Sequence, residues 1–201
     1  MSLSIILPTV NRPTLRAAIE SVVPQLNFAD ELIVIGHGDL SEARIICAEY
    51  PKVRYFEEFT KSRMGGDRRN LGMNHAYGSH FVYLDDDDVL KPDALEIIRK
   101  NIKLYPDHLL FFRMEIHPMP LAAGLFLYPK IWGDESIHEG NNICANVVVP
   151  NSVDAPKWVS MPTCNPNEET VYIEKCSKYF PYKFIDAVTH IYRPHEKPKL
   201  Q

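Results

Sequence analysis

The chain has 201 residues, and its 22 basic and 26 acidic side chains give a formal net charge of -4. Hydrophobic residues make up 45% and charged residues 24%, which is typical of a globular protein and excludes a disordered chain. A pI near 6.1 argues against a nucleic-acid-binding protein that works through bulk charge. No apolar run approaches the ~20 residues that cross a bilayer, and no signal peptide is visible. We therefore expect a cytoplasmic protein without a transmembrane segment.

The length predicts one domain over residues 1–201, since the sequence shows no repeat and no linker. Eleven of the sixteen prolines lie at or beyond Pro106, so residues 1–105 are predicted to be regular and residues 106–201 more irregular. The four cysteines form no CxxC pair, which favours free thiols in a reducing compartment.

The first half alternates short apolar runs with helical patterns. Asn11 and Pro13 are typical of a helix start, and Leu15, Ala18, Ile19, Val22 and Val23 form one buried helical stripe that Pro24 ends. In chain order, we predict strand 4–7, helix 15–23, strand 32–35, helix 41–50, strand 53–56, helix 63–77, strand 81–84 and helix 92–103.

Continuous apolar strands that alternate with helices predict an α/β fold with a mostly parallel sheet covered on both faces. We expect a three-layer, Rossmann-like α/β/α sandwich. Such sheets bind ligands beyond the carboxyl ends of their strands. The residues that follow positions 7, 35 and 84 are therefore the first candidates for function.

Four carboxylates, Asp85 to Asp88, follow the fourth predicted strand. Like charges this close repel one another unless a cation neutralises them. Mg²⁺ or Mn²⁺ prefers such oxygen ligands, so the run predicts a metal site. The alternative is a solvated acidic turn that caps the next helix, and for Asp88 this alternative stays open.

Two further segments carry polar groups near the same sheet edge. The first strand leads into Pro8, Thr9, Val10, Asn11 and Arg12, a loop before a helix that suits an anionic ligand. Arg68, Arg69 and Asn70 follow the Gly65-Gly66 pair, and an arginine fork suits phosphate. For Arg68, a solvated helix face is the simpler interpretation.

Three stretches together resemble the inverting nucleotide-sugar glycosyltransferases with the GT-A fold, often called family-two glycosyltransferases. They are residues 4–12, residues 69–72 with 76–78, and residues 81–88, where the acidic run is similar to the Asp-x-Asp motif of the family. The resemblance covers about residues 3–105. It implies transfer of a sugar from a nucleotide donor, most commonly UDP, to a hydroxyl of a glycan or other acceptor.

The resemblance also implies roles for single residues. Asp87 and Asp85 would ligate Mn²⁺ or Mg²⁺, with His195 as a further ligand. The nucleotide sugar would contact Pro8, Thr9, Asn11, Arg12, Arg69, Asp85 and Asp86. Residues 1–105 would form the nucleotide-sugar-binding half and residues 106–201 the acceptor and catalytic half.

The loop after the second strand departs from the family pattern. The family usually has Asp-Asp-Gly-Ser there, with an Asp that reads the nucleobase. This chain has Gly36, His37, Gly38 and Asp39, so Asp39 is the candidate replacement and GDP or dTDP stay open as nucleotides.

In the family that the sequence resembles, the catalytic base is the second residue of an acidic pair at the start of a helix. Glu168 and Glu169 are the best match to this pair, so Glu169 is the candidate base. Asn165 can cap such a helix, Pro166 fits its first position, and Glu168 completes a capping box. Capping therefore explains Glu168, whereas Glu169 needs another role. Near a helix N-terminus its charged form is favoured, which suits a general base.

Other residues keep two interpretations. His195 lies in a Tyr-Arg-x-His pattern that resembles the metal-ligating histidine of the family, and His190 is the second candidate; a surface histidine is the alternative. Trp132 or Trp158 could line the acceptor cleft or simply close the core.

Two other functions compete with a metal-dependent transferase. The altered loop at residues 36–39 and the Glu169 base are compatible with a non-catalytic nucleotide- or sugar-binding module. Some metal-dependent phosphohydrolases also place Asp-x-Asp after a buried strand. Those enzymes begin their fold with that strand, however, and here three strand units precede it.

Overall fold

The computed structural model describes residues 1–38, 41–59, 65–116, 131–132, 146–159 and 168–193. The first half forms β1 (Leu3–Thr9), α1 (Leu15–Val22), a 3₁₀ turn (Val23–Gln25), β2 (Glu31–His37), α2 (Ser41–Ala48), β3 (Val53–Glu58), α3 (Gly65–His75) and β4 (His80–Tyr83). The remainder forms β5 (Val89–Leu90), α4 (Ala94–Leu104), β6 (Leu109–Ile116), β7 (Ile131–Trp132), β8 (Val147–Pro150), α5 (Glu168–Tyr179) and β9 (Tyr182–Tyr192).

The strands form one sheet in the order β3-β2-β1-β4-β8-β6-β9-β5, and β7 pairs with β6. The strands β1 to β4 run parallel to one another, as predicted. The strand β8 runs antiparallel to both β4 and β6, whereas β9 is parallel to β6. The prediction of an irregular second half is wrong in part, because β6 and β9 are long strands of eight and eleven residues, although their pairing has register shifts between Phe111 and Met114.

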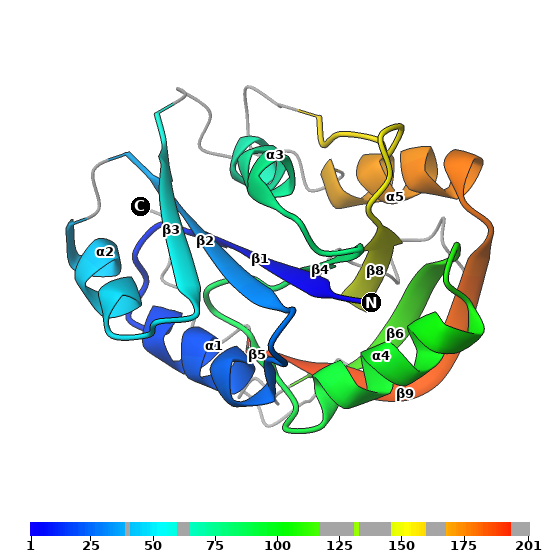
Figure 1. Ribbon diagram of the computed structural model, residues 1–201, viewed down its shortest axis with the longest axis horizontal. Coiled ribbons are helices and arrows are strands. Elements are labelled where there is room, and N and C mark those ends of the chain that lie inside the picture. The colour runs from blue at the N-terminus through cyan, green and yellow to red at the C-terminus, as the bar shows by residue number, and fades with distance from the viewer. Residues whose placement is uncertain (39–40, 60–64, 117–130, 133–145, 160–167, 194–201) are drawn as a thin grey trace, which may run out of the picture.

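Helices cover both faces of the sheet, which confirms the predicted three-layer architecture. Figure 1 shows α3 and α5 on one face and α1, α2 and α4 on the other. The carboxyl ends of β1, β2, β3 and β4 therefore lie at one edge, since these strands are parallel.

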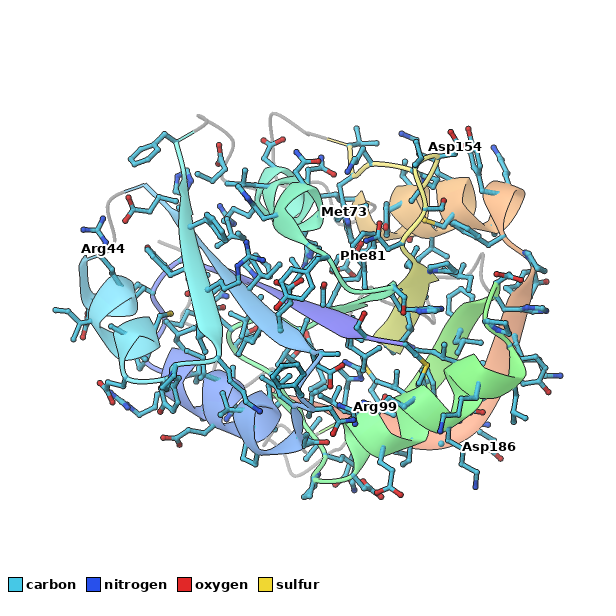
Figure 2. All side chains as sticks on the ribbon, viewed as in Figure 1. Arg44, Met73, Phe81, Arg99, Asp154 and Asp186 are labelled. Carbon is cyan, nitrogen blue, oxygen red and sulfur yellow. The ribbon has the colours of Figure 1, made fainter. Side chains whose placement is uncertain are left out.

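Two hydrophobic cores fill the layers. Alternate residues of β1, Leu3, Ile5 and Leu7, pack with the apolar stripes of α1 and α4. On the opposite face, Ile6 packs with Met73 of α3 and with Phe81, both labelled in Figure 2. Because successive side chains of β1 point to opposite faces of the sheet, this one strand contributes residues to both cores.

The start of α1 differs from the prediction. Asn11 does not cap the helix, because it lies in the left-handed region with φ 63° and its Nδ2 donates to Glu42 Oε2 at 2.8 Å. The N-cap residue is Thr14, which makes no side-chain capping bond. Pro24 lies in the 3₁₀ turn that follows α1, so the helical stripe ends where it was predicted to end.

Two of the four cysteines, Cys47 and Cys176, are free and buried in the cores. Burial raises the pKa of each thiol to about 12, so both are unreactive. Cys144 and Cys164 lie outside the described residues. None of the helices described here has the length and hydrophobicity that a bilayer span requires.

Close packing of α3 on β1 gives a stability prediction at Gly72. A Cβ at this position would lie 2.6 Å from Cγ2 of the buried, β-branched Ile6. Alanine is favoured over glycine in a helix by up to about 1 kcal/mol, but overpacking of a core costs ~1–3 kcal/mol. Gly72→Ala should therefore lower the free energy of unfolding, measured by urea denaturation. Asn74→Ala, on the exposed side of α3, is the control, and an equal effect of both changes would contradict the packing argument.

Candidate active site

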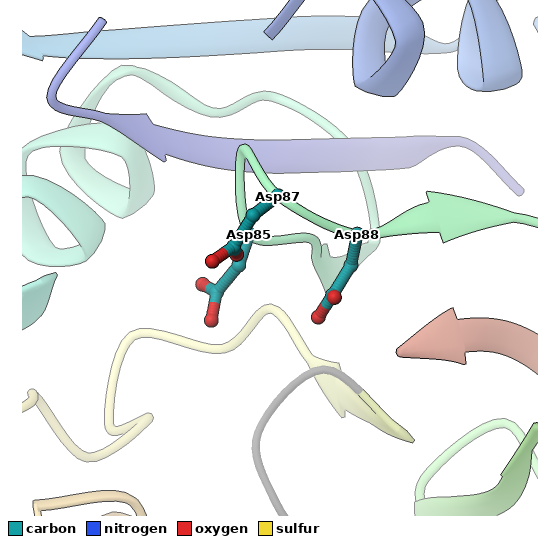
Figure 3. A group of neighbouring side chains, drawn as sticks. All are labelled: Asp85, Asp87 and Asp88. Carbon is teal, nitrogen blue, oxygen red and sulfur yellow. The ribbon is translucent and has the colours of Figure 1, made fainter. Parts of the chain in front are cut away.

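The acidic run forms a turn directly after β4, at the edge of the sheet where the carboxyl ends of β1 to β4 lie. Asp85, Asp87 and Asp88 each place one carboxylate oxygen within 4.8 Å of the others. Figure 3 shows the three side chains extending to the same side of the turn. Asp87 and Asp88 are 1% exposed, whereas the Asp85 side chain is 25% exposed. Oxygen ligands grouped in this way suit Mg²⁺ or Mn²⁺.

Asp86 points elsewhere and binds the chain itself. Its Oδ2 accepts hydrogen bonds from Thr9 Oγ1 at 2.7 Å and from Val10 N at 3.1 Å, and its Oδ1 pairs with Arg12. Thr9 Oγ1 also accepts from Asn11 N at 2.9 Å. Asp86 was expected among the nucleotide ligands, but it is fully buried and ties the loop after β1 to the acidic turn.

Arg12 is the nearest cation on the β1 side of the turn. Besides pairing with Asp86, its Nη1 lies 3.7 Å from Asp87 Oδ2. Burial alone would lower the pKa of Arg12, but attraction to Asp86 and Asp87 outweighs burial and raises it. Arg12 therefore stays charged and partly neutralises the turn.

Asp88 is neither solvated nor a helix cap, so that interpretation of it is wrong. Its Oδ1 accepts a hydrogen bond from Arg193 N at 3.0 Å, and Arg193 Nε donates to the Asp87 carbonyl at 2.9 Å. Asp93, and not Asp88, is the N-cap of α4. Because Arg193 follows β9, the end of that strand fixes the back of the acidic turn.

The two glutamates of α5 have different surroundings. Glu168 is 3% exposed and accepts a hydrogen bond from the Gly66 backbone N–H of α3, and burial raises its pKa. The Glu169 side chain is 26% exposed, with its Oε1 3.9 Å from Arg69 Nη2. Arg69 Nη2 donates to Asp85 Oδ1 at 2.6 Å, so one guanidinium links the acidic turn to Glu169. The predicted cap residues 165–167 lie outside the described residues.

The structure places Trp158 in the core. It is 3% exposed, stacks on Tyr172 at 4.0 Å between ring centroids, and lies 4.5 Å from the Arg69 guanidinium. A ring covered in this way presents no face to a sugar, so the core interpretation holds for Trp158. Trp132 belongs to β7, and its side chain is outside the described part.

His190 is also buried. Its Nε2 lies 3.3 Å from the Tyr83 carbonyl and its Nδ1 lies 2.8 Å from Thr189 Oγ1. Complete burial lowers its pKa to about 4, so the ring is neutral at pH 7. His195, the preferred metal-ligand candidate, and Asp39, the candidate for base recognition, lie outside the described residues.

Sequence reasoning missed two residues near this edge. Glu58 is buried at the carboxyl end of β3, with Oε2 3.9 Å from Nδ1 of His37 at the end of β2. The predicted strand stopped at residue 56, and extending it by two residues would have found Glu58. Arg193 carries no local signal, because its contacts with the acidic turn span more than one hundred residues.

Comparison with known proteins gives matches of two kinds. The model of the family described as "Glycosyl transferase family 2" matches residues 4–123. The protein named glycosyltransferase GlyA from Streptococcus pneumoniae serotype 4 is 26% identical over 106 residues. The match covers 51% of this chain and 15% of GlyA, so the chain spans a small part of that relative.

Solved structures of TarS from S. aureus match nearly the whole chain. The structure of TarS 1–349 in complex with UDP-GlcNAc has a TM-score of 0.77 at 14% identity, covering 100% of this chain and 60% of TarS 1–349. The UDP complex has the same TM-score of 0.77 at 15% identity, covering 98% of this chain and 62% of the other. At such identities the likeness shows the fold alone. The family model covers more than half of the chain, including β1 to β4 and the acidic turn, so the chain belongs to glycosyl transferase family 2 and has the GT-A fold.

Proposed function

We propose that this domain transfers a sugar from a UDP-sugar to an acceptor hydroxyl, with inversion at the anomeric carbon and with the help of Mn²⁺ or Mg²⁺. One observation carries the proposal. The Asp85, Asp87 and Asp88 carboxylates gather within 4.8 Å at the ligand-binding edge of a GT-A sheet, and Glu169 faces them across Arg69.

The acidic turn fits a divalent metal ion. Asp85 and Asp87 would hold it, and His195 would add a further ligand. Burial of Asp87 beside other carboxylates costs stability unless a cation is bound, which favours a hard divalent ion over an empty turn. A bound metal would offset the charge that develops on the leaving diphosphate.

The loop from Pro8 to Arg12 forms the donor side in this proposal. Thr9 and Asp86 hold the loop, and the left-handed Asn11 turns it toward α2. Arg12 supplies positive charge beside Asp87, where the diphosphate would lie. The TarS complexes with UDP and with UDP-GlcNAc support the same class of donor for this fold. Asp39 remains the proposed contact for the nucleobase.

We assign the base to Glu169 and a supporting role to Glu168. Glu169 is accessible, whereas Glu168 is buried against Gly66 with a raised pKa. Glu169 would accept the proton of the acceptor hydroxyl as its oxygen attacks the anomeric carbon on the face opposite the diphosphate. Because the donor-side residues lie before residue 105 and Glu169 lies after it, this assignment supports a donor half in residues 1–105 and an acceptor half in residues 106–201 of one domain.

A nucleotide screen tests the proposal directly. We expect UDP with Mn²⁺ to raise the melting temperature by ~5–10 °C at about 100 times its Kd, and UDP with EDTA to have little effect. GDP, dTDP and CMP are compared under the same conditions, and turnover is followed as UDP release from UDP-GlcNAc. Metal-dependent stabilisation without turnover of any nucleotide sugar would favour the non-catalytic module. No stabilisation by any nucleotide would contradict both functions.

A further inference from the structure

Two glycines at the start of α3 leave room for two side chains. A Cβ at Gly65 would overlap Arg69 Nη1, and a Cβ at Gly66 would overlap Glu168 Oε1 and lie 2.9 Å from the Val159 carbonyl. Neither glycine has a positive φ, so space and not backbone conformation requires glycine here. Gly65 thus leaves room for Arg69 of the same helix and Gly66 for Glu168 of α5, and we call these contacts the α3–α5 junction.

Arg69 crosses this junction and connects two parts of the site. Its Nη2 donates to Asp85 Oδ1 at 2.6 Å and lies 3.9 Å from Glu169 Oε1. Its side chain is only 7% exposed, and its guanidinium lies 4.5 Å from the ring centroid of Trp158. One planar fork thus contacts a carboxylate of the acidic turn, a carboxylate of α5 and an aromatic face.

The aromatic face under Arg69 is itself fixed. The Trp158 ring stacks on Tyr172 of α5, with 4.0 Å between centroids. Asn70 of α3 binds the Trp158 backbone twice, because its Nδ2 donates to the carbonyl at 3.0 Å and its Oδ1 accepts from the amide at 2.8 Å. The Gly66 N–H bond to Glu168 closes the same junction from the other side. Arg69 therefore lies on the ring of Trp158, which contacts both α3 and α5.

We infer that Arg69 is a positioning residue that holds Asp85 and Glu169 at a fixed separation, so that the donor side and the base act on one reacting centre. The inference rests on the proposed function and gives Arg69 a role other than the nucleotide contact that the resemblance implied. Lysine is a poor substitute, because a single ammonium group has no planar fork and cannot stack as a guanidinium does. A displacement of about 1 Å at a reacting centre costs on the order of 100-fold in rate.

Arg69→Lys tests the inference because it keeps the charge. We expect the kcat for UDP release from UDP-GlcNAc to fall on the order of 10–100-fold. The affinity for UDP at saturating Mn²⁺, measured by calorimetry, should stay close to that of the parent. Arg16→Lys, in the surface pair with Glu49, is the matched control and should leave both quantities unchanged. A large loss of nucleotide affinity in Arg69→Lys would instead make Arg69 a nucleotide ligand and overturn the inference.

A second readout is independent of turnover. In a Trp132→Phe background, Trp158 is the remaining tryptophan, and its fluorescence reports the cover that Arg69 provides. Arg69→Lys should increase acrylamide quenching of Trp158, and Arg16→Lys should not. Unchanged quenching together with unchanged kcat would overturn the inference while leaving the proposed function intact. If the parent neither binds UDP with Mn²⁺ nor releases UDP, the proposed function fails and the positioning role fails with it.

A double-mutant cycle with Glu169 separates positioning from general structural damage. If Arg69 acts by orienting Glu169, Arg69→Lys should cost much less in kcat when Glu169 is already Gln. Full additivity of the two changes would show that Arg69 does not act through Glu169.

Discussion

Asp87→Ala is expected to abolish Mn²⁺-dependent nucleotide binding. Asp87 is 1% exposed and lies at the centre of the acidic turn, with Asp85 and Asp88 within 4.8 Å. Removal of this carboxylate takes away both a ligand oxygen and the charge that attracts the cation. The melting temperature without metal should stay the same or rise, because repulsion within the turn decreases. The measurement is thermal stability with Mn²⁺, with UDP, and with both together.

Asp87→Asn and Asp88→Asn form a matched pair for this test. Each keeps the size of the side chain and one carbonyl oxygen while removing a charge. Asp87→Asn should lose most of the metal response, whereas Asp88→Asn should keep it, because Asp88 serves mainly to accept the hydrogen bond from Arg193 N. Asp88→Ala should likewise retain nucleotide binding but lose stability. If the Asp87 variants bind Mn²⁺ and UDP as the parent does, the metal site has been placed wrongly.

The strands and helices of the first half could be predicted because their signals are local. Apolar runs and helical stripes recur within short windows, and they identified β1 to β4 and α1 to α4 in the correct order. The carboxyl ends of β1, β2 and β3 were each placed two residues short, because Thr9, His37 and Glu58 are polar although each is part of the sheet. Polar residues at strand ends reduce the apolar signal at the sheet edge where ligands bind.

Parts of the site that depend on distant contacts could not be predicted in this way. The acidic turn is contiguous and was found, but its fixation by Arg193 joins residues 105 positions apart. The sequence assigned Glu168 a local role as part of a helix cap. In the structure its hydrogen-bond partner is Gly66 of α3, which lies about one hundred residues earlier in the chain. Nor does any local pattern indicate that Trp158 lies beneath Arg69. Local sequence patterns thus identified the carboxylates but not the residues that orient them.

Glu169→Gln is expected to lower turnover by about 10²–10⁴-fold, the usual contribution of a general base. Glutamine keeps the size and polarity of the side chain but does not accept the proton of the acceptor hydroxyl. The affinities for UDP and Mn²⁺ should change little, because Glu169 lies on α5 and is linked to the acidic turn through Arg69. Calorimetry measures these affinities, and UDP release from UDP-GlcNAc measures turnover.

Glu168→Gln is the matched control on the same turn of α5. Glu168 is buried against Gly66 and its pKa is raised, so a neutral glutamine keeps the hydrogen-bonded packing and much of the activity. The free energy of unfolding should change by no more than about 1 kcal/mol, because the neutral amide avoids the burial cost of the carboxylate and its oxygen still accepts the Gly66 N–H. If Glu168→Gln is the inactive variant and Glu169→Gln is active, the acidic pair has been assigned one residue out of register. If both variants keep full turnover, the base lies elsewhere in the acceptor half, with Asp134, Glu135 and Glu139 as the next residues to substitute.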